Sequence, residues 1–227
     1  MLGQPHRHFR RTDSTNERAK ELALAGAPHG TLVTADEQSA GRGRQGRSWL
    51  ADPGDALLAS VVVRDPEPIL PLAAAVAVAD ACDALTGAHA AIKWPNDVWL
   101  DRRKLAGILV EGRPQEGWAV LGIGVNVVTE EFPDELRELA TSLRLEGIDL
   151  STADVLERLL HALDRWLERP TNEVLAAWRA RDALLGEEVR WANGSGVGAG
   201  VDETGALLVE TAEGRVALQA GEIHLLR

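Results

Sequence analysis

Cysteine is almost absent from this chain: among 227 residues there is one, Cys82. A single cysteine cannot form an intrachain disulfide, and nothing in the sequence points to an oxidising compartment. Alanines and two aspartates surround it, which is typical of a small buried hydrophobic side chain rather than of a nucleophile. We therefore expect Cys82 to be a core residue.

Long apolar runs are also lacking. The longest one, residues 69–79, contains Pro71 and is well short of the roughly 20 residues that a membrane-spanning helix needs. The N-terminal residues hold no apolar stretch of the kind found in secretory signal peptides. The sequence therefore predicts a cytoplasmic protein with no membrane partner.

Positive charge is scarce as well. Lys and Arg number 24 against 35 Asp and Glu, giving a formal net charge of −11. A general nucleic-acid binder carries the opposite excess, so no nucleic-acid partner is expected. The six histidines are scattered; only His6 and His8 lie close together, in a terminus that we expect to be mobile. No metal-ligand cluster is predicted. The apolar fraction of 45% is ordinary for a globular protein with a full core.

Against this acidic background, residues 41–47 (GRGRQGR) alternate three glycines with three arginines. Glycine lets backbone amides turn toward a ligand, and arginine matches carboxylate or phosphate oxygens two at a time. The stretch therefore indicates an anionic ligand, although a solvated basic loop explains it equally well when it is taken alone. Its G-x-G-x-x-G spacing also fits a dinucleotide fingerprint. That interpretation fails, because residues 48–55 hold Pro53 and Gly54 where a helix should follow.

Hydrophobic periodicity and turn residues divide the chain into a large α+β part and a small β part. Ser14 with Glu17 has capping-box spacing and should begin a helix that ends near Gly26 or Gly30. The predicted strands are residues 31–35, 57–64, 91–94, 98–100, 104–111 and 118–128. The other predicted helices are residues 71–85, 133–139, 151–168 and 173–183.

From Gly186 onward, turn signals recur about every ten residues, at residues 193–194, 204–205 and 213–214. Such spacing is typical of short hairpin strands and predicts a small SH3-like β-barrel. We therefore expect a mixed-sheet α+β domain over residues 1–183 and a barrel domain over residues 184–227.

Several other short motifs carry polar groups at the ends or in the middle of predicted strands. They are residues 93–97 (KWPND), 104–109 (KLAGIL) and 122–126 (GIGVN), together with Gln38 just ahead of the basic loop. Each alone has a simple structural explanation. Lys93 and Lys104 can be solvated strand ends, and Asn96 and Asp97 turn formers.

Taken together with residues 13–16 (DSTN) and residues 38–47, these motifs occur in the order seen in biotin–protein ligases, and the chain resembles that family. The resemblance covers roughly residues 12–227. A lipoate- or other acyl-adenylating ligase is the nearest alternative, because lipoate ligases share the fold. Their glycine-triplet signature is absent here, which disfavours that alternative. A non-catalytic biotin-responsive regulator is a second.

The resemblance implies an enzyme that activates biotin with ATP, as MgATP, and transfers the biotinyl group to a lysine of a biotin carboxyl carrier protein domain. It implies that Ser14, Thr15, Asn16 and Gln38 hold the ureido ring. Arg42, Gly43, Arg44 and Lys104 would line the carboxylate and the α-phosphate, with Gly107 beside biotin and with Arg44 and Lys104 as the catalytic pair. Arg47, Lys93, Asn96 and Asp97 would face ATP, its phosphates or Mg²⁺, and Trp49 and Asn126 would border the adenylate.

Many members of the family carry an N-terminal DNA-binding domain and double as repressors. Only about eleven residues precede the first motif here, so we expect the monofunctional form. A homodimer is compatible with the sequence.

Overall fold

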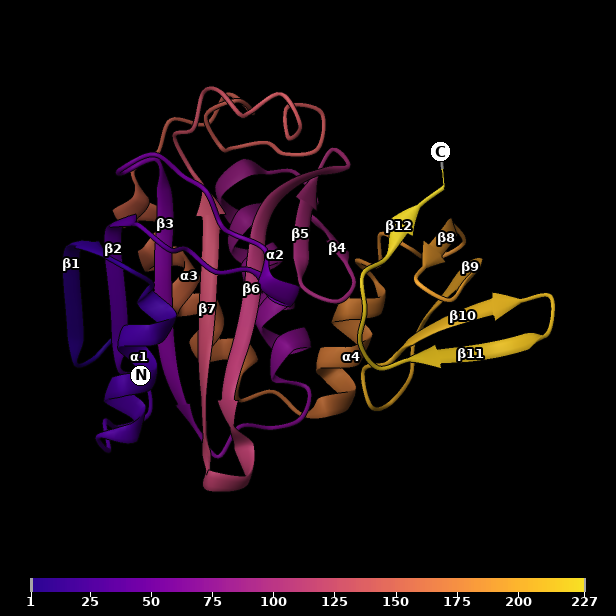
Figure 1. The fold of residues 1–227 in the computed structure, drawn as a ribbon, viewed down its shortest axis with the longest axis horizontal. Helices are drawn as coiled ribbons and strands as arrows, with labels where there is room; N and C mark the ends of the chain where they lie inside the picture. The colour runs from indigo at the N-terminus through magenta and orange to yellow at the C-terminus, as the bar shows by residue number, and fades with distance from the viewer. Residues whose placement is uncertain (1, 227) are drawn as a thin grey trace.

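The computed structural model describes residues 2–226; Met1 and Arg227, the outer limits of the two predicted domains, lie outside the described residues. The described residues form a seven-stranded sheet of order β1-β2-β3-β7-β6-β5-β4 and a five-stranded sheet of order β11-β10-β9-β8-β12 (Figure 1). The larger sheet consists of β1 (His6–Thr12), β2 (Leu32–Gln38), β3 (Ala56–Arg64), β4 (Ala91–Lys93), β5 (Asp97–Leu100), β6 (Arg103–Arg113) and β7 (Trp118–Asn126). The helices are α1 (Thr15–Leu24), α2 (Leu70–Thr86), α3 (Thr152–Trp166) and α4 (Thr171–Arg179).

Helices cover both faces of the larger sheet. Strand β3 shows why, because its side chains alternate between two hydrophobic clusters. Val61 and Val63 belong to the main core with α2 and α3, whereas Val62 packs with Ala19 and Ala23 of α1. Helix α1 covers only part of its face (Figure 1). The part of that face that α1 does not cover forms the floor of the cleft described below. The described residues hold no helix long and apolar enough to cross a membrane.

Helix α2 lies almost wholly inside the protein. Most of its residues are buried, and it packs against α3 on one side and the sheet on the other. Cys82 lies on this helix, 2% exposed, and burial raises the pKa of its thiol to about 12. The expectation that it is a core residue is confirmed.

The small C-terminal sheet consists of β8 (Glu188–Trp191), β9 (Gly194–Val201), β10 (Leu207–Thr211), β11 (Gly214–Leu218) and β12 (His224–Leu225). It is open, so the expected closed barrel is wrong. Strands β11 and β12 lie at opposite edges of the strand order, and β12 is only two residues long, too short to close the sheet. Trp94 Nε1 donates to the carbonyl of Gly205 at 3.0 Å, which ties this sheet to the end of β4.

Three local expectations are also corrected. His6 and His8 lie in β1, which pairs in parallel with β2, not in a mobile terminus. Ser14 is the N-cap of α1, but within the described residues its side chain makes no capping hydrogen bond, and the Glu17 carboxylate pairs with Lys20 and Arg42 instead of completing a capping box. Residues 133–139 form turns rather than a helix. In contrast, the capping box of Ser151 with Asp154 is present at the start of α3.

Candidate functional site

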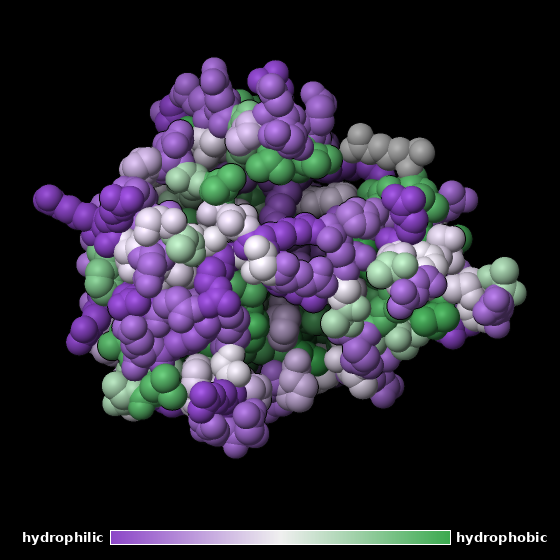
Figure 2. All heavy atoms as spheres, viewed as in Figure 1, coloured by the Kyte–Doolittle hydropathy of each residue, from purple (hydrophilic) through white to green (hydrophobic). Residues whose placement is uncertain are grey.

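A cleft opens on the α1 side of the larger sheet, between the strands and the loop that follows β2. Figure 2 shows this face hollowed near its centre, with mostly hydrophilic side chains around the hollow. Of the predicted site residues, Asn126 alone lies outside this cleft, in an adjoining cavity. The cleft brings together Ser14, Thr15, Asn16, Gln38, Arg42, Gly43, Arg44, Arg47, Trp49, Lys93, Asn96, Asp97, Lys104 and Gly107.

The floor of the cleft is a strip of the sheet without side chains. Gly107 of β6 lies opposite Gly124 of β7. A Cβ at Gly124 would lie 2.6 Å from the Trp49 ring, and one at Gly107 would lie 2.9 Å from it. The indole therefore lies directly on the two glycines, at a distance that any other residue would prevent. Gly122, two residues before Gly124, plays the same part for Asn16, whose Oδ1 would be 2.1 Å from a Cβ there.

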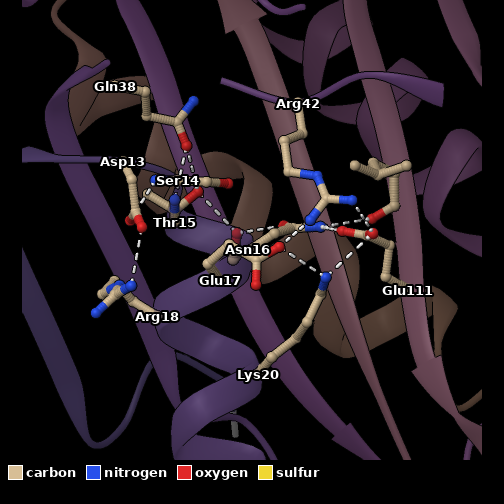
Figure 3. Close-up of polar contacts among 12 residues, drawn as sticks. Asp13, Ser14, Thr15, Asn16, Glu17, Arg18, Lys20, Gln38, Arg42 and Glu111 are labelled. Carbon is tan, nitrogen blue, oxygen red and sulfur yellow. Dashed lines mark hydrogen bonds and ion pairs between the residues drawn. The ribbon is translucent and has the colours of Figure 1, made fainter. Parts of the chain in front are cut away.

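At one end of the cleft, neutral polar groups form a connected chain (Figure 3). Thr15 donates to Gln38 Oε1 from its backbone N at 2.7 Å and from its hydroxyl at 3.0 Å. The hydroxyl of Ser60, on β3, lies 2.8 Å from Thr15 Oγ1 and donates to Asn16 Oδ1 at 2.6 Å. Thr15 and Asn16 are each 4% exposed, and Ser60 is fully buried. Such an end is built to hold a neutral polar group in one orientation.

The other end of the cleft is cationic. Lys104 Nζ lies 2.7 Å from Asp97 Oδ1 and 5.5 Å from the centre of the Trp49 ring. Arg44 donates to Asn96 Oδ1 at 3.3 Å. Burial lowers the pKa of Lys93; Asp97 opposes that effect, and the neighbouring cation Lys104 adds to it. Half-buried cations so close together favour an anionic ligand, which would relieve both their desolvation and their mutual repulsion.

The loop between β2 and β3 supplies Arg42, Arg44 and Arg47. Arg47 N donates to Arg44 O at 3.1 Å, which closes a short 3₁₀ turn, Arg44–Gly46, and Gly43 N donates to Arg47 O at 2.7 Å across it. Gln45 occupies the left-handed region there, with φ of 54°, a conformation that few side chains adopt readily. In the middle of the loop, Arg47 pairs with Glu222, which lies between β11 and β12 of the C-terminal part. The cleft thus has contributions from both parts of the chain.

The adjoining cavity was missed in large part by sequence reasoning. It is lined by apolar residues of the turns that follow β7, including Phe132, Leu136 and Leu139, and by His224. Asn126 lies at its edge and donates to Thr141 O at 2.9 Å. Apolar residues in a loop can indicate the lining of a cavity. Here they were assigned to a helix over residues 133–139, so the cavity was not predicted. Ser60 and Glu111 were also missed, since a lone polar residue inside a strand has no motif around it.

The site holds few metal ligands. Within residues 2–226, no group of three or more His, Cys, Asp or Glu side chains is placed to hold a metal ion. Asp97, one of the four residues expected to face ATP, its phosphates or Mg²⁺, lies at the cationic end beside Asn96 and is paired with Lys104. Because Mg²⁺ bound to a nucleotide takes most of its ligands from phosphates and water, one carboxylate and one amide fit a metal that arrives with its ligand.

Comparison with known proteins places this geometry in a family. Residues 8–127 match the Biotin/lipoate A/B protein ligase family, and residues 184–226 match the Biotin protein ligase C terminal domain. The chain is 36% identical to the biotin–[acetyl-CoA-carboxylase] ligase of Paracoccus denitrificans, over 94% of this chain and 97% of that protein. It is also 36% identical to the bifunctional ligase/repressor BirA of Bacillus spizizenii, over 93% of this chain and 71% of that protein.

Solved structures give the same result. The biotin protein ligase of Aquifex aeolicus in complex with biotin and ATP superposes with a TM-score of 0.83 at 32% identity, over 99% of each chain. Both parts of the chain are therefore accounted for by one group of proteins, in sequence and in fold. The chain belongs to the biotin/lipoate A/B protein ligase family.

Proposed function

We propose that this protein is a biotin–protein ligase, which activates biotin with ATP and transfers the biotinyl group to a lysine of a biotin carboxyl carrier protein domain. One observation carries the proposal beyond family membership. A chain of neutral hydrogen-bonding groups and a cluster of cations lie at the two ends of one cleft. Biotin has a neutral polar ring at one end and a carboxylate at the other, and the carboxylate must meet the phosphates of ATP.

In the first reaction, a biotin carboxylate oxygen attacks the α-phosphorus of ATP, the new P–O bond forms, and pyrophosphate leaves. Two anions approach each other, so fixed positive charge is the main requirement. Arg44 and Lys104 are the candidates for the reacting oxygens, and Arg47 and Lys93 for the leaving phosphates. Trp49 and Asn126 would border the adenylate. Mg²⁺ neutralises phosphate charge when it is bound, and Asp97 is the carboxylate nearest the cationic cluster.

In the second reaction, the amine of a carrier lysine attacks the acyl carbon of biotinyl-5′-AMP. An amide bond forms, AMP leaves with the electron pair of the broken C–O bond, and the amine loses its proton. The mixed anhydride is already activated, so no side chain of this protein has to become acylated. This agrees with the position of Cys82, whose thiol is buried in the core and is not accessible as a nucleophile.

The test is incubation with ATP, Mg²⁺, labelled biotin and a purified carrier domain. We expect label on the carrier, and pyrophosphate exchange that depends on biotin. Exchange driven by lipoate instead of biotin would favour the alternative ligase of the same fold. An intact ATP site without carrier labelling would favour a regulator.

Three further predictions from the sequence accompany the proposal. We expect no operator binding, because the net charge is −11 and non-specific contacts to phosphate weaken steeply with salt. Salt-resistant, sequence-specific binding to a duplex in the presence of biotin and ATP would contradict this. A cytoplasmic location and a homodimer stay predictions, which fractionation and sedimentation can test.

A further inference from the structure

One acidic residue follows directly after the apolar segment of a strand beside the cleft. Glu111 lies on β6, two residues after Leu109 and four after Gly107, so it shares their face of the sheet. Its side chain is 21% exposed. No motif led to it, and nothing in the proposed chemistry uses it. A carboxylate that is removed this far from water needs specific partners.

The first partner is Asn16. Its Nδ2 donates to Glu111 Oε2 at 3.0 Å and lies 3.4 Å from the Leu109 carbonyl oxygen. Both of these groups can only accept, so the amide nitrogen must face them. The amide oxygen must then face the opposite way, where it accepts from Ser60 at 2.6 Å. With both N–H groups engaged, Asn16 offers any ligand one free site, which is an acceptor on Oδ1.

The second set of partners is cationic. Glu111 Oε1 lies 3.1 Å from Lys20 Nζ and 3.0 Å from Arg42 Nη2. Burial raises the pKa of Glu111, but hydrogen bonds from Asn16 and Lys20 and the charges of Lys20 and Arg42 outweigh it, so the pKa lies below its usual value. Glu111 is therefore a carboxylate at neutral pH. In Figure 3, one side of the Glu111 carboxylate faces Asn16, and the other faces the cations of Lys20 and Arg42.

We propose that Glu111 is a positioning residue for recognition of the ureido ring: it fixes the Asn16 amide with its oxygen toward a ring N–H. The same carboxylate pins Arg42, so that the loop lies beside the ring site. The inference rests on the proposed function, since it concerns the chemistry of the ligand held by Asn16.

The structure provides a matched control in Glu17. Its carboxylate pairs with Lys20 at 2.9 Å and with Arg42, as Glu111 does. Among residues 2–226, the Glu17 carboxylate accepts from Lys20 and Arg42 but makes no hydrogen bond with the Asn16 side chain. Replacing either glutamate with leucine removes an anion from Lys20 and Arg42, but only the change at Glu111 takes the acceptor away from Asn16.

The experiment is calorimetric titration of the full chain with biotin alone. We expect Glu111→Leu to weaken biotin binding by about 10- to 100-fold, because the Asn16 amide is left free to turn. Glu17→Leu should stay within about 3-fold, the range expected for a partly exposed ion pair. Glu111→Gln, whose amide oxygen can still accept from Asn16, should recover most of the affinity.

A double-mutant cycle separates positioning from general damage. If Glu111 acts through Asn16, Glu111→Leu should weaken binding by no more than about 3-fold in an Asn16→Ala background. Equal losses in both backgrounds, or equal losses for Glu17→Leu and Glu111→Leu, would overturn the inference. Should Glu111→Leu not fold, Glu111→Ala takes its place in the same cycle. A wild-type protein that binds no biotin would overturn the proposed function itself.

Discussion

The two ends of the cleft are built in different ways. At the neutral end, Asn16 and Ser60 lie on a helix and a strand, are buried, and have their hydrogen bonds satisfied by other parts of the fold. At the cationic end, Arg44 and Arg47 lie on one loop and are partly exposed, whereas Arg42 of the same loop reaches Glu111 beside Asn16. The first end is fixed by the packing of the sheet. The second depends on ion pairs and on a short turn, and its cations lie close enough together to favour an anionic ligand.

The difference indicates a division of labour. A neutral ring offers few strong interactions, so selectivity for it requires donors and acceptors held in place beforehand. A polyanion offers strong charge-assisted hydrogen bonds, and these can order a loop at the time of binding. We therefore expect changes at the neutral end to act on affinity and changes at the cationic end to act on rate.

Lys104→Ala should give the largest effect. It removes a charge directed at the reacting oxygens, and the loss of one preorganised group of this kind costs on the order of 10²–10³ in rate. Pyrophosphate exchange measures it, with biotin affinity as the companion measurement, which should change much less. A rate within a few-fold of wild type, with normal folding, would remove Lys104 from the reaction.

Gly122→Ala tests the neutral end. The added methyl group would lie 2.1 Å from Asn16 Oδ1, so Asn16 must move away from Ser60. We expect biotin affinity to fall by about 10-fold or more, since the site loses a preorganised hydrogen bond. The affinity for ATP should hold, which serves as the control for folding. If both affinities fall together, the two ends are not independent.

Limited trypsin digestion tests the loop. Arg42, Arg44 and Arg47 are cleavage sites on a segment with three glycines, and order there costs backbone entropy. Biotin with Mg-ATP should slow cleavage at these three arginines by about 10-fold or more if binding stabilises the closed loop by more than about 1.4 kcal/mol. Cleavage at exposed arginines elsewhere, such as Arg137, should not change. Equal rates with and without ligands would mean that the loop is already fixed.

Ser60→Ala should give the smallest effect. The change deletes one buried hydroxyl and leaves its partners Thr15 and Asn16 in place, where other groups still hold them. A lost buried hydrogen bond of this kind costs about 1 kcal/mol, or roughly a 5-fold weaker affinity for biotin. A loss as large as that of Gly122→Ala would mean that Ser60 itself contacts the ligand.

The sequence predicted the layered fold well where periodicity was strong. Strands β3 and β7 and helices α2 and α3 were expected close to their observed bounds, because apolar repeats of that length fit one kind of element. Strand β1 was missed. Its basic, exposed residues carry no apolar alternation, and it forms because β2 offers it an edge to pair with. Such long-range pairing leaves no local trace.

The site was predictable in the same uneven way. Residues within compact motifs, such as Arg44 and Asn96, meet in the cleft as expected. Glu111 and Ser60 were not found, because each acts by touching a residue far away in the chain: Asn16 is 95 positions from Glu111 and 44 from Ser60. The role of such a residue depends on which distant residues the folded sheet brings next to it. A single sequence does not reveal those contacts.

The buried thiol of Cys82 has a practical consequence for watching the loop in solution. Thiolates attack maleimide reagents, and a buried thiol with a pKa of about 12 stays almost entirely protonated and shielded. A second cysteine placed at exposed Gln45 would therefore take a fluorophore alone. The natural protein already has the silent background that single-site labelling requires, and closure of the loop over its substrates could be followed in real time by the emission of one dye.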